Sequence, residues 1–427
     1  MIATFQNPLG RRSFLANGAA ALGAGVFAHE SPLAAFQARA AEAAPPMKVT
    51  SVGTTHWKSR NDAPFEPQWM WVRIETDTGL VGIGETFPRS EVEAAMVHNT
   101  AAGALLGRDP RDIERIWADL YRIFDHQVGG GTEMRAHSAI DLALWDLYGK
   151  ALRVPVYRLI GGKSNPRVRL YNTCYSSKYD FLKEPEKLVD DLMSRCGIRA
   201  FKIWPFDAAR RRNKSQYVTG ADIEEGLGPV RKLREKFGMD IEILMEFHGL
   251  WDLTSAVRIA KALEPYKPMW LEDMILPGNY EQYRRLADQT SLPLTISERT
   301  GNHLQYLRLL ESRAASYVMF DLCWCGGLTS ARRIATLADA YLLPVTPHTA
   351  GGPLLFYAST HFSTAATNVA IQESVERYWA GVFPKVLANP IQPKDGAVEA
   401  PELPGFGMEV KPEIWKHPAA ITQTSKL

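Results

Sequence analysis

The sequence has few cysteines, almost no excess charge and no long apolar run, and each shortage excludes a class of protein. Its 427 residues contain four cysteines, at positions 174, 196, 323 and 325, with no Cys-x-x-Cys pair. A disulfide scaffold and a structural zinc site are therefore excluded. The 49 Lys and Arg residues against 47 Asp and Glu leave a formal net charge of +2, which disfavours nucleic acid as a partner. An apolar fraction of 46% excludes a disordered chain.

The amino terminus differs in composition from the rest of the chain. Arg11-Arg12 precedes a run of small residues from Ala16 to Ala28, which is too short and too weakly apolar to span a bilayer. This pattern is similar to the twin-arginine export signal of bacteria, and Ala38-Arg39-Ala40 offers a cleavage site. We therefore expect residues 1–44 to be an export signal rather than an amphipathic helix. The expected destination is the periplasm, with no membrane anchor.

The region after residue 48 alternates between strand and helix patterns. Two apolar runs, Trp69 to Thr76 and Leu80 to Glu85, flank an Asp-Thr-Gly turn and predict an antiparallel hairpin. Helical periodicity follows over three stretches, Glu91 to Leu106, Ile113 to Phe124 and Met134 to Lys150. The opening region is therefore expected to be α+β.

A different texture begins after Gly162, where short β-rich runs alternate with amphipathic helical stretches. Eight such runs are typical of a (β/α) barrel, and no GxGxxG motif of a dinucleotide site follows the first of them. The expected strands are 168–171, 200–204, 241–246, 270–272, 294–297, 317–320, 343–346 and 369–372. The basic run Arg210–Arg212 lies in an interruption of this pattern and is expected to be a solvated loop.

Ionisable residues close six of these runs at intervals of 23 to 27 residues. They are Glu246, Glu272, Glu298, Asp321, His348 and Glu373. Because the carboxyl ends of barrel strands meet at one rim, all six are expected at a common site. The three glutamates from consecutive strands would converge, and like charges that close stay ionised only when a cation holds them. A site made only of carboxylates suits Mg²⁺.

A second group of candidates would supply proton transfer. Asp321 beside His348 is the arrangement of a general base, because the carboxylate fixes the tautomer of the imidazole and raises its basicity. Lys202 ends the second run, and an ammonium near a metal could be pushed towards neutrality. His248 lies two residues after Glu246, hence on the same side of an extended strand.

The roles of some aromatic and sulfur side chains stay open at this point. Trp204, Trp251 and Trp324 could line the site or pack between the barrel and the region before it. Cys323 and Cys325 are interpreted as small buried side chains rather than ligands.

Several segments resemble the mandelate racemase group of the enolase superfamily. They are Ala139–Asp146 with Gly149-Lys150, Pro155–Gly162, the Glu/Glu/Glu series, Asp321, Pro347-His348 and Glu373. The resemblance implies a modified TIM barrel, (β/α)7β, under an α+β N-terminal capping domain that the C-terminal tail completes. The implied boundaries are 1–44 for the signal, 45–165 for the cap, 166–385 for the barrel and 386–427 for the returning segment.

The resemblance also implies the chemistry of the site. Glu246, Glu272 and Glu298 match the ligands of Mg²⁺, and Asp321 with His348 match the dyad that removes the proton beside a substrate carboxylate. Glu373 would donate a hydrogen bond to that carboxylate, which requires a protonated Glu. Phe247-His248-Gly249 is similar to sugar-acid dehydratases, in which this His protonates the departing 3-hydroxyl.

Two positions depart from the family pattern. Glu246 stands where Asp is usual, and its extra methylene shifts the carboxylate. Trp204 replaces the second lysine of a Lys-x-Lys pair, which argues against a two-base proton transfer that uses lysine.

Three functions follow as hypotheses. The first is a Mg²⁺-dependent dehydratase of a hexonate- or hexarate-type sugar acid, the second an epimerase, racemase or cycloisomerase through the same enediolate, and the third a non-catalytic sugar-acid binding protein. The substrate would be chosen by cap loops near 56–67 and 128–135, and a homo-oligomer is expected by analogy. Because the net charge is near zero, attraction for an anionic substrate must come from the cation and a few rim residues.

Overall fold

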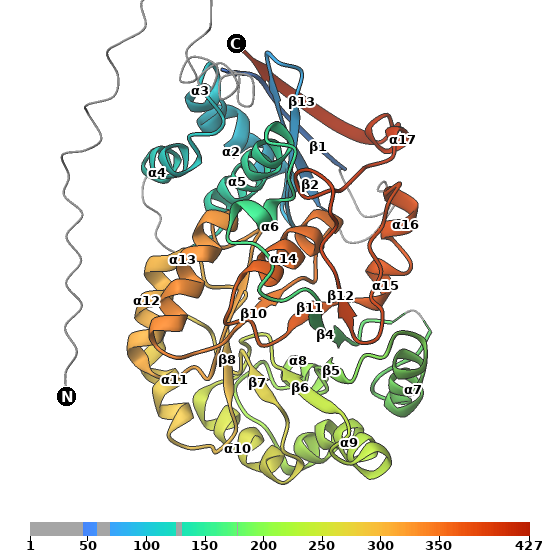
Figure 1. Cartoon of the computed structure of the whole chain (residues 1–427). Helices are drawn as coiled ribbons and strands as arrows, with labels where there is room; N and C mark the ends of the chain where they lie inside the picture. The colour runs from blue at the N-terminus through green and yellow to red at the C-terminus, as the bar shows by residue number, and fades with distance from the viewer. Residues whose placement is uncertain (1–45, 58–68, 125–129, 177) are drawn as a thin grey trace, which may run out of the picture. The chain divides into compact units, whose positions relative to one another are not determined.

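Eight parallel strands form a nearly closed barrel in the computed structural model, which describes residues 46–57, 69–124, 130–176 and 178–427 (Figure 1). Their order is β10-β9-β8-β7-β6-β5-β4-β11, and a bridge between Val345 and Val369 lies near the junction of β10 and β11. The strands are β4 (Val168–Thr173), β5 (Ala200–Ile203), β6 (Glu242–Glu246), β7 (Trp270–Glu272), β8 (Leu294–Ile296), β9 (Tyr317–Asp321), β10 (Val345–His348) and β11 (Gln372–Ser374). Each overlaps an expected run, so the predicted barrel is confirmed.

Helices occupy the seven connections between these strands. In chain order they are α7 (Pro185–Cys196), α8 (Asp207–Arg212) with α9 (Gly220–Phe237), α10 (Leu253–Leu263), α11 (Tyr280–Ala287), α12 (His303–Ser312), α13 (Gly327–Ala340) and α14 (Pro353–Ala365). The Thr219 side chain caps α9 by accepting from the Asp222 amide, whose carboxylate accepts from Thr219 in return.

The basic run expected as a loop is helical instead. Arg210–Arg212 form the last turn of α8, and Arg212 lies 2.7 Å from Asp222 and 2.5 Å from Glu225. The expectation failed because these ion pairs to the next helix compensate the clustered positive charge.

A four-stranded antiparallel sheet in the order β13-β1-β2-β3 forms the α+β capping region. Its last strand comes from the carboxyl end of the chain, with Thr54 of β1 opposite Gln423 of β13, so the expected return of the tail is confirmed. The elements are β1 (Val49–Trp57), β2 (Met70–Thr76), β3 (Val81–Thr86), α2 (Ser90–Met96), the π-helix η1 (Val97–Ala101), α3 (Ala102–Leu105), α4 (Ile113–Ile123), α5 (Thr132–Ala151), α6 (Val156–Leu159) and β13 (Ala420–Lys426). The segment before β13 holds α15 (Glu376–Trp379), α16 (Phe383–Val386), β12 (Ala397–Val398) and α17 (Pro412–Trp415).

Close packing holds the cap together, and a buried carboxylate joins the cap to the barrel. A Cβ at Gly84 of β3 would lie 1.7 Å from the carbonyl oxygen of Ala139, so only glycine lets α5 approach the strand this closely. The buried carboxylate of Glu85 accepts hydrogen bonds from the amides of Leu354 and Leu355 in the first turn of α14. A carboxylate at a helix amino terminus satisfies free amides and meets the positive end of the helix dipole.

Apolar side chains fill the barrel below its carboxyl rim. The barrel is therefore closed below the rim by a buried cluster of six residues: Tyr171, Ala200, Leu244, Trp270, Met319 and Ile371. All four cysteines are free and buried, which agrees with the interpretation of Cys323 and Cys325 as small buried side chains. In the described part of the chain, no helix is long and apolar enough to cross a membrane. The expected export signal lies outside the described residues, as do most of the 56–67 loop and residues 125–129.

Candidate active site

Three glutamates converge at the carboxyl rim of the barrel. Glu246 and Glu272 end the neighbouring strands β6 and β7, where they are opposite each other in register, and Glu298 follows β8 by two residues. One carboxylate oxygen of each lies within 4.8 Å of the others, and all three residues are buried. The structure therefore brings together the three residues predicted as metal ligands.

The electrostatics of this group suit a cation. Burial and the neighbouring Glu246 raise the pKa of the Glu272 carboxyl well above its usual value. Burial also raises the pKa of Glu246, but His248 and Lys202 outweigh it and hold that pKa below its usual value. Oε2 of Glu298 is buried without a hydrogen-bond partner. An orphaned carboxylate oxygen among acidic neighbours fits a hard divalent cation, so the residues present fit Mg²⁺.

Lys202 stands beside this group and is charged. Its Nζ lies 2.7 Å from Glu272, 3.0 Å from Glu373 and 3.4 Å from Glu246. Burial lowers the pKa of Lys202, but these carboxylates outweigh it and raise the pKa well above its usual value. The expectation of a lysine pushed towards neutrality is not met in this structure, because three anions from separate strands surround the ammonium. As a fixed cation, Lys202 can hold negative charge on a ligand.

Asp321 and His348 form the predicted dyad on adjacent strands. The two residues are opposite each other at the ends of β9 and β10, and Oδ2 of Asp321 lies 2.7 Å from Nδ1 of His348. The other ring nitrogen, Nε2, lies 3.5 Å from Glu373. Burial lowers the pKa of His348, but Glu373 and Asp321 outweigh it and raise the pKa to about 9. This geometry directs Nε2 towards the site and gives it the basicity of a general base.

Glu373 lies in β11 between Lys202 and His348. It accepts hydrogen bonds from the Thr173 hydroxyl and, at 2.6 Å, from the Thr349 amide. Burial raises the pKa of Glu373, but Lys202, His348 and these hydrogen bonds lower it below its usual value. The expectation of a protonated Glu373 is therefore not met in this structure, because two cations and two donors surround the carboxylate.

His248 has a carboxylate partner that the sequence reasoning missed. Its Nδ1 lies 3.1 Å from Asp207, the first residue of α8, and its amide donates to Glu246 at 2.5 Å. Burial lowers the pKa of His248, but Glu246 and Asp207 outweigh it and raise that pKa. The site thus contains two imidazole–carboxylate pairs, one after β6 and one at the ends of β9 and β10.

Asp273 is a second residue missed from the sequence. It is buried directly after Glu272, accepts from the Ser297 hydroxyl at 2.5 Å, and its Oδ1 has no hydrogen-bond partner. Burial and the charge of Glu298 raise its pKa well above the usual value. The sequence signal that could have identified Asp273 is its place next to Glu272, a candidate metal ligand. Asp273 adds a fourth carboxyl beside the three glutamates.

Two of the three candidate tryptophans contact the imidazoles. The ring of Trp324 lies 5.6 Å from that of His348, and the ring of Trp204 lies 6.2 Å from that of His248. Trp251 is buried and packs in the core. Trp324 also contacts the cap, since its indole donates to the Phe87 carbonyl at 2.9 Å.

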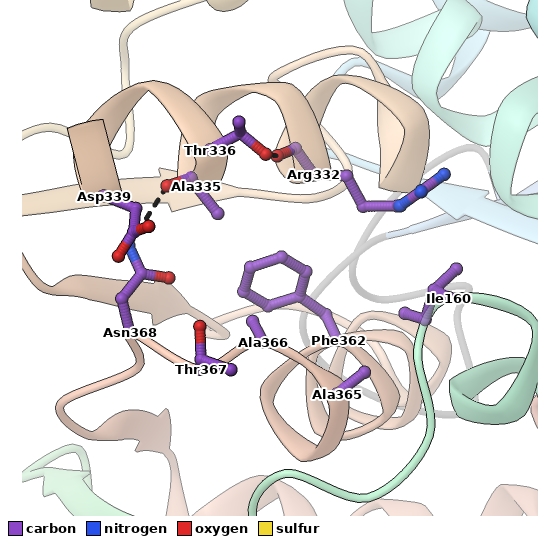
Figure 2. Close-up of a pocket in the computed structure, with 10 residues that line it drawn as sticks. All are labelled: Ile160, Arg332, Ala335, Thr336, Asp339, Phe362, Ala365, Ala366, Thr367 and Asn368. Carbon is purple, nitrogen blue, oxygen red and sulfur yellow. Dashed lines mark hydrogen bonds between the residues drawn. The ribbon is translucent and has the colours of Figure 1, made fainter. Parts of the chain in front are cut away.

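A surface cavity between α13 and the end of α14 lies apart from this site. Figure 2 shows its lining, which includes Arg332, Asp339 and Asn368, and Asn368 donates to the Ala335 carbonyl at 3.1 Å. None of the predicted site residues lines it. The rim of the barrel is therefore the candidate active site.

Comparison with known proteins gives the same family for both halves of the chain. Residues 44–161 match the mandelate racemase/muconate lactonizing enzyme N-terminal domain, and residues 185–414 match the enolase C-terminal domain-like family. The D-galactonate dehydratase of Pectobacterium atrosepticum is 32% identical over 377 residues, covering 86% of this chain and 93% of that protein. The D-galactonate dehydratase of Ralstonia nicotianae is 32% identical over 85% of this chain and 92% of its own.

Solved structures of relatives share the fold. A crystal structure of an enolase of the mandelate racemase subgroup from Agrobacterium tumefaciens is 37% identical, with a TM-score of 0.80 over 89% of this chain and 99% of that chain. A member of the enolase superfamily from Salmonella Typhimurium is 30% identical, with a TM-score of 0.81 over 89% of this chain and 100% of its own. The chain therefore belongs to the mandelate racemase/muconate lactonizing enzyme family of the enolase superfamily, and it is an enzyme.

Proposed function

We propose that the protein is a Mg²⁺-dependent dehydratase of a six-carbon sugar acid. The proposal rests on one observation: two histidines, each paired with its own carboxylate, lie at the same rim as the three glutamates. Dehydration needs a base for the proton at C2 and an acid for the hydroxyl at C3, because hydroxide leaves poorly unless it is protonated. A proton transfer that ends at C2 would need no acid for a leaving hydroxyl.

The order of the strands supports this division of labour. His348 ends β10 and His248 follows β6, and these strands are four apart in an eight-stranded barrel. Strands four apart face each other across the barrel axis, so the two imidazoles approach a bound ligand from opposite sides. This arrangement suits removal of the proton and the hydroxyl from opposite faces of the substrate.

In the proposed reaction, Nε2 of His348 takes the proton from C2, and the electron pair forms an enediolate of the substrate carboxylate. His248 then gives its proton to the 3-hydroxyl, the C3–O bond breaks and water leaves. The enol product tautomerises to a 2-keto-3-deoxy acid. Asp321 holds His348 through Nδ1, which leaves Nε2 to meet the substrate, and Asp207 holds His248 through Nδ1 in the same way.

Glu246, Glu272 and Glu298 would hold Mg²⁺, which when bound supplies positive charge to the substrate carboxylate. Lys202 adds a fixed positive charge beside Glu272 and Glu246, and its ammonium donors need no reorganisation as charge develops. Glu373 orients Lys202 and lies near Nε2 of His348.

The relatives named D-galactonate dehydratase support a hexonate-type substrate, and the hexarates are the dicarboxylic acids of the same six-carbon skeleton. The test is to incubate the Mg²⁺-loaded protein with a panel of hexonates and hexarates in D₂O and to follow products by NMR. Formation of a 2-keto-3-deoxy acid from at least one member is expected. Deuterium at C2 without loss of water would instead indicate epimerisation, and binding without any turnover or exchange would contradict an enzymatic role in this class.

We also propose that the chain is exported to the periplasm by the twin-arginine route, on the support of Arg11-Arg12 and the small-residue run that follows. Replacing both arginines by lysine should retain the protein in the cytoplasm of a bacterial host. Fractionation of cells that express the full chain measures this, and equal periplasmic yield of the two forms would contradict the proposal.

A further inference from the structure

Arg135 of the cap reaches the rim of the barrel beside the general base. It lies in the first turn of α5, and its guanidinium carbon is 4.5 Å from the centre of the Trp324 ring. The same ring lies 5.6 Å from that of His348. The side chain is 20% exposed, so it is largely desolvated.

No acceptor in the described chain takes up the donors of Arg135. The closest carboxylate is Glu93 of α2, whose Oε1 lies 4.0 Å away, beyond hydrogen-bonding distance. Both oxygens of Glu93 are buried and without a hydrogen-bond partner. Burial raises the pKa of Glu93 to about 7, so its negative charge is incomplete at neutral pH. The five N–H donors of Arg135 are therefore available to a ligand.

The position of Arg135 distinguishes it from the other charges of the site. Lys202 and the three glutamates lie at the ends of β5 to β8, where the reacting carboxylate of the substrate would bind. Arg135 comes from the cap and lies against the ring of Trp324, whose indole also donates to the Phe87 carbonyl of the cap. Arg299, by contrast, is committed to Glu298, with Nε 3.2 Å from Oε1.

We infer that Arg135 binds a second carboxylate at the far end of the substrate, so that the preferred substrate class is the hexarates, the dicarboxylic six-carbon sugar acids. This inference rests on the proposed function. A planar guanidinium matches a carboxylate with two parallel N–H···O bonds. A hexonate would set a neutral hydroxymethyl group against a largely desolvated cation that has no hydrogen-bond acceptor among the described residues, and such a mismatch costs affinity.

The experiment compares kcat/KM for hexarates such as galactarate with kcat/KM for hexonates such as galactonate in the Mg²⁺-loaded protein. The wild type should prefer hexarates, and Arg135→Gln should lower kcat/KM for hexarates by about 10- to 100-fold. The change for hexonates should stay within about 3-fold. Arg135→Lys keeps the positive charge but loses the planar pair of N–H donors, so it should retain part of the preference for hexarates over hexonates.

Arg333 offers a matched control, because its guanidinium also stacks on a tryptophan, 4.4 Å from the Trp117 ring, and its carboxylate partner is Glu114. Arg333→Gln should leave the ratio of the two kcat/KM values unchanged. Equal losses on both substrate classes in Arg135→Gln, or a wild-type preference for hexonates, would overturn the inference and leave Arg135 as a support for Trp324.

Binding separates this inference from the proposed function. Titration calorimetry of galactarate and galactonate with His348→Asn and with His348→Asn/Arg135→Gln measures affinity where proton abstraction is blocked. Tighter binding of galactarate that depends on Arg135 supports the inference even if no sugar acid is dehydrated, an outcome that would defeat only the proposed function. If galactarate bound the two variants with equal affinity, the inference would be overturned, even if the wild type dehydrates a sugar acid.

Discussion

Asp321 holds the Nδ1 atom of His348 at 2.7 Å from the end of the neighbouring strand. The contact is between two residues in register on parallel strands, so its geometry is set by the backbone of the barrel rather than by flexible side chains. Nδ1 carries the proton towards the carboxylate, which leaves Nε2 as the basic nitrogen. The pKa of His348 and the orientation of its ring therefore both depend on Asp321.

Asp321→Asn should lower both the rate and the pH at which His348 loses its proton. Asp321 raises the pKa of His348, so its neutral replacement should move the rising limb of kcat/KM against pH to lower pH. The plateau should fall by about 10²- to 10⁴-fold, because the imidazole loses its tautomeric preference. A pH–rate profile of the two proteins measures both effects.

Asp141 supplies the control for this profile. Asp141 is also buried and accepts from the Thr329 amide at 3.0 Å, but it belongs to α5. Asp141→Asn should leave the rising limb of kcat/KM at the same pH, even if the fold is less stable. If the rising limb also stayed at the same pH in Asp321→Asn, that result would contradict His348 as the base.

Bound Mg²⁺ should stabilise the fold through the three glutamates. A ligand that binds only the native state at 100 times its Kd contributes about 2.7 kcal/mol, and here it would also relieve repulsion among the buried carboxylates. Thermal unfolding with Mg²⁺ or with EDTA measures the shift in Tm. Glu298→Gln should lose most of the shift, whereas Glu402→Gln, which changes a surface ion pair with Lys163, should keep it. An equal shift in Glu298→Gln would contradict the proposed ligand set.

Removing the acid should separate proton abstraction from loss of water. His248→Asn should lower dehydration by about 10²- to 10⁴-fold while exchange of the C2 proton with D₂O continues, since His348 is intact. Asp207→Asn should lower dehydration by about 10- to 100-fold, because it removes the partner 3.1 Å from Nδ1 of His248. NMR of the substrate in D₂O follows both events.

Asp191→Asn is the control for Asp207, since Asp191 lies in α7 and pairs with Lys178 and Arg195 rather than with a histidine. It should change neither rate. If His248→Asn lost exchange and dehydration to the same extent, His248 would act in proton abstraction or in shaping the acidic group rather than as the acid.

The acidic group and the dyad were predictable because the barrel converts sequence spacing into position. Glu246, Glu272 and Asp321 are the last residues of β6, β7 and β9, and parallel strands bring their ends to one rim whatever the intervening helices contain. Periodic apolar runs were enough to place those ends to within a few residues. The register of the strands then follows from the pattern of the apolar residues.

The partners of these groups were not predictable, because they depend on the path of the backbone between elements. Asp207 is 41 residues before His248 and reaches it only because α8 starts directly after β5. Asp273 follows Glu272, and strand alternation would place it on the opposite face, but its φ of +46° turns the chain at the strand end. The charge of Lys202 depends on carboxylates from β6, β7 and β11.

Glu85 should make the stability of the cap on the barrel depend on pH. Burial raises the pKa of its carboxyl to about 7, so the folded state retains a proton that the unfolded chain releases near its usual pKa of 4.5. Its contribution to stability is therefore complete below about pH 4.5 and is lost as the pH rises through about 7, a change of about 3 kcal/mol. The glutamine in Glu85→Gln cannot titrate. The free energy of unfolding of the wild type minus that of the variant should therefore fall by about 3 kcal/mol from pH 4.5 to pH 7.5. Urea unfolding at the two pH values measures it, and a constant difference would show that Glu85 stays ionised against the first turn of α14.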